Sequence, residues 1–145
     1  MMKVFLGGTV NDSKWRDRIM PKLKIEYFNP VVENWNQEAY EREIYEREHA
    51  DYCLYVITPR MEGFYSLAEV VEDSHKKTEK TIYCYLEEDG DRKFSAYQIE
   101  ALQNIGKKIE ENGAIWKKTL DEVVLYLNST PYKPQNTDNN SEDKS

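Results

Sequence analysis

Carboxylate and aromatic side chains gather in three short segments of the sequence, each of which follows an apolar run. The segments are GGTVND (7–12), FNPVVENW (28–35) and TPRMEGFYSLAE (58–69). Aromatic faces stack on a nucleobase, whereas carboxylates accept hydrogen bonds from sugar hydroxyls and, in one case, can attack an anomeric carbon. We therefore expect a ligand that combines a sugar and a base. The candidate contact residues are Asp12, Asn29, Trp35, Tyr65, Ser66 and Glu69.

Glu69 is the carboxylate best placed for nucleophilic attack. The stretch 51–73 contains a buried strand, a Pro/Gly loop and the first turn of a helix, which brings Glu69 to the carboxyl end of the strand. Open α/β sheets bind their ligands there. However, Ser66 and Glu69 also have the spacing of an S-x-x-E capping box, in which Glu69 would return to the backbone amide of Ser66. A nucleophile would turn into the crevice near Gly7, whereas a cap would point back along its own chain.

Two further acidic residues, Glu43 and Asp51, precede the strand that delivers Glu69. Their spacing leaves both near one face of the predicted helix and its exit. With Glu69 they could form a set of like charges, in which mutual repulsion keeps one carboxyl protonated. The alternating charges of EREIYEREHAD more commonly mark a solvated helix face, and Asp51 could simply end the helix.

The turn Gly7-Gly8-Thr9 is not a phosphate-binding signature, because it has neither the G-x-G-x-x-G nor the Walker pattern. Gly7 and Gly8 do permit close approach of the backbone to a ligand. His49 and His75 have no metal-ligand spacing to each other or to the cysteines, so we expect no bound metal.

Strand-like apolar runs alternate with helical segments along the chain. We expect strands over 3–8, 24–30, 52–58, 81–86 and 114–116, and helices that begin near residue 12 and that cover 37–50, 66–78, 94–112 and 119–128. Pro21 should kink or divide the first helix. Such alternation is typical of an α/β fold with right-handed crossovers. We therefore predict a doubly wound sheet of four to five mostly parallel strands flanked by helices.

Length and composition limit the number of domains and the classes of partner that the chain can have. The 145 residues fit one domain, which we place at residues 1–130. Residues 131–145 form a polar, acidic tail that should be disordered. The formal charge of −7 argues against nucleic-acid binding. No segment approaches the roughly 20 apolar residues of a membrane span, and Cys53 and Cys84 should be small buried side chains, so we expect a cytoplasmic protein without a membrane partner.

Four segments, taken together, resemble the nucleoside 2-deoxyribosyltransferase-like family. They are KVFLGGT with the following Trp15, FNPVVENW, DYCLYVITPRMEG and FYSLAEVVEDS, within residues 3–86. The resemblance implies a flavodoxin-like fold and cleavage of the N-glycosidic bond of a 2'-deoxynucleoside. In that family a glutamate attacks C1 of the sugar, and the covalent deoxyribosyl-glutamate is resolved by another base or by water, without a cofactor. The chain would thus be a nucleoside deoxyribosyltransferase or a deoxynucleoside N-glycosidase.

Carried onto this sequence, the resemblance implies that Glu69 is the nucleophile and that Glu43 contacts and protonates the leaving base. Asp51 matches an acidic residue at the start of the third strand, and the GGT turn would line the sugar pocket. Transferases of this family also carry an aspartate in the pocket loop around Gly63, where this chain has Glu62.

The resemblance further implies a homo-oligomer, because transferases of the family complete each pocket with an asparagine and an aromatic residue from a neighbouring subunit. Asn128 is the candidate here. Few cations, Arg16 and Arg60, accompany the predicted site, which favours a small-molecule deoxynucleoside or nucleobase over a nucleotide. The departure at Glu62 favours an alternative, a non-catalytic module that binds a nucleoside or nucleotide as a sensor or sequestering protein. A protein that uses helix 37–50 only for assembly would leave the carboxylates and aromatics unexplained.

Overall fold

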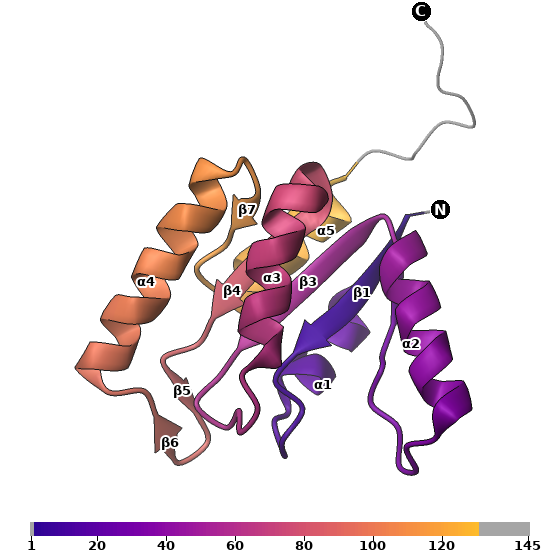
Figure 1. The fold of residues 1–145 in the computed structure, drawn as a ribbon, viewed down its shortest axis with the longest axis horizontal. Coiled ribbons are helices and arrows are strands. Elements are labelled where there is room, and N and C mark those ends of the chain that lie inside the picture. The colour runs from indigo at the N-terminus through magenta and orange to yellow at the C-terminus, as the bar shows by residue number, and fades with distance from the viewer. Residues whose placement is uncertain (1, 131–145) are drawn as a thin grey trace, which may run out of the picture.

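A five-stranded parallel sheet forms the centre of the computed structural model, which describes residues 2–130 (Figure 1). The predicted tail, 131–145, lies outside the described residues. The strand order is β2-β1-β3-β4-β7, which extends outward in both directions from β1 and β3, as in flavodoxin-like folds. The predicted fold class is confirmed. The strands are β1 (Lys3–Gly8), β2 (Glu26–Phe28), β3 (Tyr52–Ile57), β4 (Thr81–Tyr85) and β7 (Ile115–Trp116).

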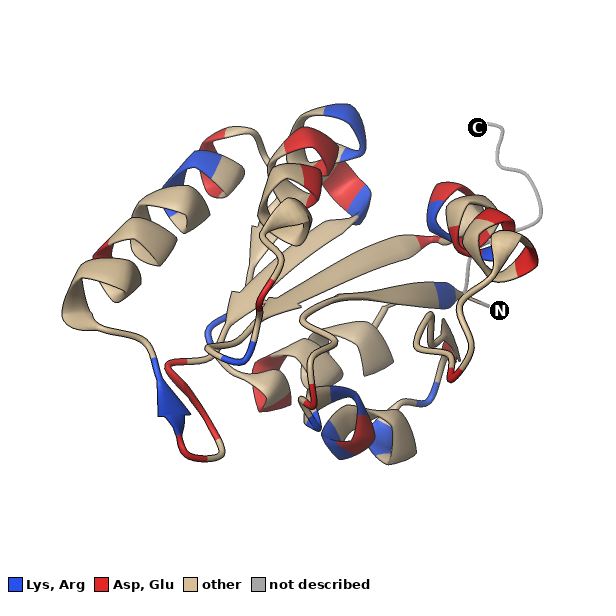
Figure 2. Cartoon of the chain, turned by 60° about the horizontal axis from the view of Figure 1, so that its bottom comes forward, with Lys and Arg blue, Asp and Glu red and all other residues tan. Residues whose placement is uncertain are grey.

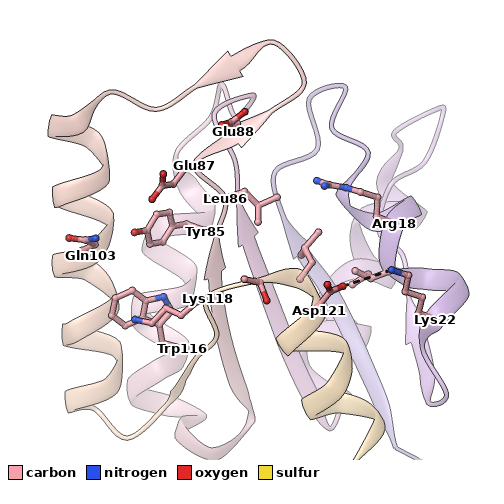
Figure 3. Close-up of a pocket in the computed structure, with 13 residues that line it drawn as sticks. Arg18, Lys22, Tyr85, Leu86, Glu87, Glu88, Gln103, Trp116, Lys118 and Asp121 are labelled. Carbon is pink, nitrogen blue, oxygen red and sulfur yellow. Dashed lines mark ion pairs between the residues drawn. The ribbon is translucent and has the colours of Figure 1, made fainter.

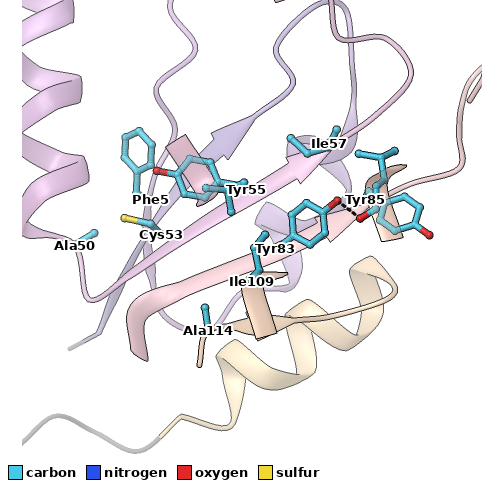
Figure 4. Close-up of a cluster of buried hydrophobic side chains, with 11 residues drawn as sticks. Phe5, Ala50, Cys53, Tyr55, Ile57, Tyr83, Tyr85, Ile109 and Ala114 are labelled. Atoms are coloured by element: carbon cyan, nitrogen blue, oxygen red, sulfur yellow. Dashed lines mark hydrogen bonds between the residues drawn. The ribbon is translucent and has the colours of Figure 1, made fainter. Parts of the chain in front are cut away.

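Helices cover both faces of this sheet. One face carries α2 (Gln37–His49), α3 (Tyr65–Lys76) and α4 (Ala96–Glu111), and the other carries α1 (Trp15–Ile19) and α5 (Leu120–Asn128). Alternate residues of β3 supply the two cores. Tyr55 belongs to the cluster under α3 and α4, whose side chains Figure 4 draws, whereas Leu54 belongs to the cluster under α1 and α5. Because helices bury both faces, the central strands are near-continuous apolar runs.

The two cysteines lie on opposite faces of the sheet. Cys53 belongs to the core under α3 and α4, and Cys84 to the core under α1 and α5. Both are buried and free within the described residues, which confirms the prediction that they are small buried side chains. Burial raises the pKa of the Cys53 thiol to about 11, so it stays protonated at neutral pH.

Charged residues are concentrated on the helices, the loops and the ends of the strands (Figure 2). The middles of the strands are apolar because helices cover them on both faces. In the described part of the chain, every helix is too short or too polar to cross a bilayer.

The first helix is divided at Pro21, as the sequence predicts. α1 ends at Ile19, and a 3-10 turn over Met20–Lys22 follows with the proline in its first turn. Proline has no backbone N–H to continue the helical ladder, but it fits the start of a new turn. A second 3-10 turn, Thr78–Lys80, leads from α3 into β4.

A short antiparallel hairpin lies between β4 and α4, in a segment for which the sequence predicts neither a strand nor a helix. Its strands are β5 (Glu88–Asp89) and β6 (Arg92–Lys93), and the chain turns at Gly90 with a φ of 65°. Arg60, in the loop after β3, pairs with Asp91 at 3.0 Å. The hairpin is therefore tied to the segment that leads into α3.

Candidate functional site

A pocket of about 770 Å³ opens at the carboxyl ends of β1 and β3, where the order of the strands reverses. The loops after β1, β2 and β3 all contribute to its wall, together with α2 and α3. It brings together most of the residues predicted from the sequence: Gly7, Gly8, Thr9, Asp12, Trp35, Glu43, Gly63, Tyr65, Ser66 and Glu69.

The turn after β1 lies close against β3. Gly8 has a φ of 109°, and a Cβ there would lie 2.2 Å from the carbonyl oxygen of Val56. Thr9 continues the contact, because its backbone N–H donates to Val56 O at 2.9 Å and its Oγ1 accepts from the Thr58 amide at 2.9 Å. The glycines therefore let the backbone itself form the pocket floor.

Arg16 stabilises the turn after β1 through hydrogen bonds to its backbone. It is buried, and its guanidinium donates to the carbonyl oxygens of Leu6 at 3.0 Å and Thr9 at 2.6 Å. Burial lowers the pKa of Arg16 to about 10, against the opposing charges of Glu43 and Asp17. Its hydrogen bonds to carbonyl groups make it a support for the turn.

Glu69 faces the pocket and does not cap its helix. α3 begins at Tyr65 with Phe64 as its N-cap, so Ser66 lies inside the helix and the capping-box interpretation is wrong. The Glu69 carboxylate instead lies 3.3 Å from Arg47 Nη1, with its side chain 20% exposed. Burial raises the pKa of Glu69, and the charge of Arg47 opposes that rise.

Glu43 also lines the pocket and is half-buried, so it does not lie on the fully solvated face of α2. Burial raises the pKa of Glu43, while Arg47 and Arg16 act to lower it. Glu43 in turn raises the pKa of Glu69. The two carboxyls are thus electrostatically coupled across one cavity.

Asp51 does not reach the pocket. It precedes β3 and therefore lies at the amino edge of the sheet, where its Oδ2 accepts from the Lys3 amide at 2.9 Å. A set of like charges that includes Asp51 and Glu69 is excluded by this position, because the pocket is at the opposite edge. Asp51 instead joins the starts of β1 and β3.

Two asparagines that the sequence suggested as pocket residues instead make hydrogen bonds that stabilise the fold. Asn29 Oδ1 accepts from the Val31 amide at 3.0 Å, which forms the turn after β2, and Asn29 is absent from the described pocket wall. Asn128 accepts from the Lys24 amide at 2.7 Å and donates to Lys22 O at 2.9 Å. Its amide therefore joins α5 to its own chain.

Several residues that line the pocket or contact its wall were not among the candidate contact residues predicted from the sequence. Glu62 lines the wall, and its amide donates to Asn11 Oδ1 at 3.0 Å. Arg47, which contacts Glu69, lies one helical turn after Glu43, so the four-residue spacing was an available signal. The other lining residues are Phe5, Val10, Asn11, Arg16, Pro30, Val31 and Val32.

A second cavity of about 650 Å³ lies beyond the carboxyl ends of β4 and β7, with α4 on one side and α1 and the start of α5 on the other (Figure 3). Lys118 Nζ lies 3.2 Å from the ring centroid of Trp116 there, and Lys22 pairs with Asp121 at 3.9 Å. Its described wall contains none of the predicted site residues.

Comparison with protein families matches residues 1–88, the segment from β1 through β4, to the family described as nucleoside 2-deoxyribosyltransferase like. The matched segment contains every lining residue of the larger pocket. Searches of curated proteins and of solved structures gave no significant match.

Proposed function

Because the chain belongs to the nucleoside 2-deoxyribosyltransferase-like family, we propose that it cleaves the N-glycosidic bond of a 2'-deoxynucleoside through a covalent sugar–Glu69 intermediate. The family itself indicates an activity of the transferase kind. The observation that carries the finer proposal is the position of the Glu69 carboxylate, which faces the pocket beside Glu43 and away from its own helix start.

In the first step, a Glu69 carboxylate oxygen forms a bond to C1 of the sugar as the C1–N bond breaks. The electron pair of that bond goes to the base, which takes a proton from Glu43. Burial raises the pKa of Glu43, which increases the protonated fraction of this carboxyl at a given pH and so suits it to the role of acid. Glu69 must be ionised for this step, and Arg47 favours its charged form.

In the second step, a nitrogen of another base, or water, attacks C1. The C1–O bond to Glu69 breaks, its electron pair returns to the carboxylate, and Glu43 accepts the proton of the acceptor. The two displacements retain configuration at C1. Transfer and hydrolysis differ only in the acceptor that reaches C1.

The pocket wall suits an uncharged nucleoside better than a nucleotide. Among the described lining residues, Arg16 is the one cation, and it supports the turn after β1. Carboxylates on the same wall would repel a phosphate. Trp35 and Tyr65 supply aromatic faces for a base. The lining carboxylates are Asp12, Glu43, Glu62 and Glu69.

We also propose that a second copy of the chain covers the pocket mouth, as the family implies. Large apolar side chains flank the mouth on both sides, a feature that marks interaction surfaces. We call this set the apolar rim. It comprises Val31, Val32, Trp35, Tyr40, Ile44, Phe64 and Tyr65, all exposed.

Incubation of the protein with each natural 2'-deoxynucleoside, with and without free adenine, tests the reaction. Base exchange supports a transferase, and base release without exchange supports an N-glycosidase. Denaturing mass spectrometry should detect a deoxyribosyl adduct on the peptide that contains Glu69. Glu69→Ala should abolish the adduct and lower turnover at least about a thousandfold.

Glu100→Ala is the matched control, since Glu100 is an exposed carboxylate of α4. It should react like the parent. A Glu69→Ala variant that is as active as the parent would show that the nucleophile is assigned to the wrong residue.

A non-catalytic nucleoside-binding module is the second candidate, favoured by Glu62 in place of the family's loop aspartate. Its longer side chain lines the pocket. Calorimetric binding of a deoxynucleoside without turnover or adduct would support this candidate. If Glu62→Asp then gained turnover, the loop carboxylate would be identified as the missing catalytic element.

A further inference from the structure

Arg47 makes a separate contact with each of its three guanidinium nitrogens. Nε donates to Tyr55 Oη at 2.8 Å, Nη2 donates to Asp73 Oδ1 at 3.0 Å, and Nη1 lies 3.3 Å from Glu69 Oε2. Tyr55 Oη in turn donates to Asp73 Oδ2 at 2.5 Å. Two contacts fix the plane of the guanidinium, so the direction of the third is determined.

Tyr55 and Asp73, at one end of this network, lie in the core, whereas Glu69, at the other end, lines the pocket. Tyr55 and Asp73 are each 1% exposed, whereas the Arg47 side chain is 24% exposed. Burial raises the pKa of Tyr55, so its hydroxyl remains a donor to Asp73. The backbone of Arg47 is held as well, because its carbonyl accepts from Lys77 Nζ at 3.1 Å.

We propose that Arg47 is a positioning residue for Glu69, which it holds toward the pocket and stabilises as the carboxylate that departs when the sugar ester is broken. This inference rests on the proposed function. An arginine fork suits the role, because its planar donors fix a carboxylate in orientation as well as in charge.

The charge of Glu69 changes during the reaction, and its ion pair with Arg47 is lost and formed again as a result. In the first step, the carboxylate oxygen becomes part of a neutral ester, and Arg47 keeps Asp73 and Tyr55 as partners. In the second step, the electron pair of the C1–O bond returns to Glu69, and the ion pair forms again. Arg47 therefore stabilises the product of the second step more than its reactant, which should speed breakdown of the adduct.

Several charged groups face the Glu69 carboxyl. Besides Arg47, they are Glu43 on α2 and Glu72 and Asp73 on α3, all three of which raise the pKa of Glu69. Asp12, Arg16 and Glu62 complete the charged wall of the pocket. Arg47 is thus the one cation among the described groups that act on Glu69.

Arg47→Gln removes the charge, and Arg47→Lys keeps it without the fork. In Arg47→Gln, the acidic limb of kcat/KM should move to higher pH, because Glu69 loses the group that favours its charged form. Adduct breakdown, followed by quench-flow and mass spectrometry, should slow roughly tenfold or more. Arg47→Lys should restore the pH profile in part.

Arg42→Gln is the matched control. Arg42 lies on the same helix and pairs with Glu46 at 3.1 Å, away from the pocket wall. It should leave both the pH profile and adduct breakdown as in the parent.

A titration of the Glu69 side-chain carboxyl by carbon-detected NMR measures how Arg47 changes the pKa of Glu69. This measurement does not depend on catalytic activity. Arg47→Gln should raise the Glu69 pKa. Asp73→Asn should lower it, because it removes a carboxylate that raises the pKa of Glu69 and that competes with Glu69 for the charge of Arg47. If Arg47→Gln does not fold, Asp73→Asn carries the test by itself.

An unchanged Glu69 pKa in folded Arg47→Gln, or in Asp73→Asn where Arg47→Gln does not fold, overturns the proposal, as does unchanged adduct breakdown in Arg47→Gln. Failure of the proposed function gives a different result. The parent would then form no adduct with any deoxynucleoside, while the Glu69 pKa would still respond to the substitutions at Arg47 and Asp73.

Discussion

At the scale of single residues, Glu69 should make the protein less stable than it could be. Burial raises its pKa, so the folded chain binds the Glu69 proton more tightly than the unfolded chain does. The stability that this carboxyl contributes is present below its unfolded pKa and is lost as the pH rises through its folded pKa. An ionised Glu69 therefore destabilises the fold at neutral pH, as is common for groups kept for function.

Glu69→Gln should consequently raise the free energy of unfolding at pH 7 by about 1 kcal/mol. The gain should shrink as the pH falls and vanish where Glu69 is protonated in both states. Urea denaturation from pH 4 to 8 measures it. Glu72→Gln is the control on the same helix. It removes an exposed i,i+4 pair with Lys76 and should lower stability slightly. A Glu69→Gln variant less stable at pH 7 than the parent would mean that the Arg47 pair outweighs burial.

Glu43 should be required in its protonated form, so activity should fall as the pH rises through its pKa. Glu43→Gln should lower kcat on natural deoxynucleosides about a hundredfold and remove this alkaline limb. A deoxyguanosine methylated at N7 carries a cationic base that departs without protonation. Its cleavage should be nearly the same in the variant and the parent. Equal losses on both substrates would show that Glu43 does not act as the acid.

At the scale of elements, the pocket depends on the close parallel contact between β1 and β3. Gly8→Ala should destabilise the fold by about 3 kcal/mol or more, because the residue has a positive φ and a Cβ would meet backbone atoms of Val56. Gly63 is the control, since a Cβ there would meet nothing within 4 Å among the described residues. Gly63→Ala should stay within about 0.5 kcal/mol of the parent in the same denaturation experiment.

Most elements could be predicted from the sequence because their signals are local. β3 and β4 are apolar runs, and Pro21 ends α1 wherever the helix packs. The β5–β6 hairpin was missed because two-residue strands have no period to detect, and its attachment is a long-range contact between Arg60 and Asp91.

The pocket could be predicted in outline, because loops after parallel strands meet at one edge. The same rule places Asp51 away from the pocket, because a residue that precedes a parallel strand lies at the opposite edge of the sheet. The spacing of Arg47 from Glu43 indicates a shared helix face, but its partners come from β3 and α3, which are distant in the sequence. The capping box failed because α3 begins at Tyr65, one residue before Ser66.

At the scale of the whole molecule, the apolar rim is a group of large apolar side chains that the described fold leaves exposed. Phe64 is 68% exposed and Tyr65 76% exposed on one side of the pocket, and Trp35 is 57% exposed on the other. A monomer would leave these side chains in water beside a cavity that must exclude water for transfer to compete with hydrolysis. Association through the rim would cover both.

The protein should therefore sediment as a dimer or larger assembly at micromolar concentration. A Phe64→Ser and Ile44→Ser double variant removes one apolar side chain from each side of the mouth and spares the lining residues. Its dissociation constant should rise at least about tenfold, since a buried interface aromatic commonly contributes more than 1 kcal/mol. Tyr97→Ser, at an exposed position of α4, should change nothing.

When the parent and the double variant are diluted in series, turnover should fall as the assembly dissociates. If the neighbouring copy closes the pocket, the double variant should lose base exchange before it loses base release, because an open pocket admits water as the acceptor. Analytical ultracentrifugation and the exchange assay at matched concentrations measure the two together. A parent that is monomeric and fully active across the series would show that one chain completes the site, and the apolar rim would then need another explanation.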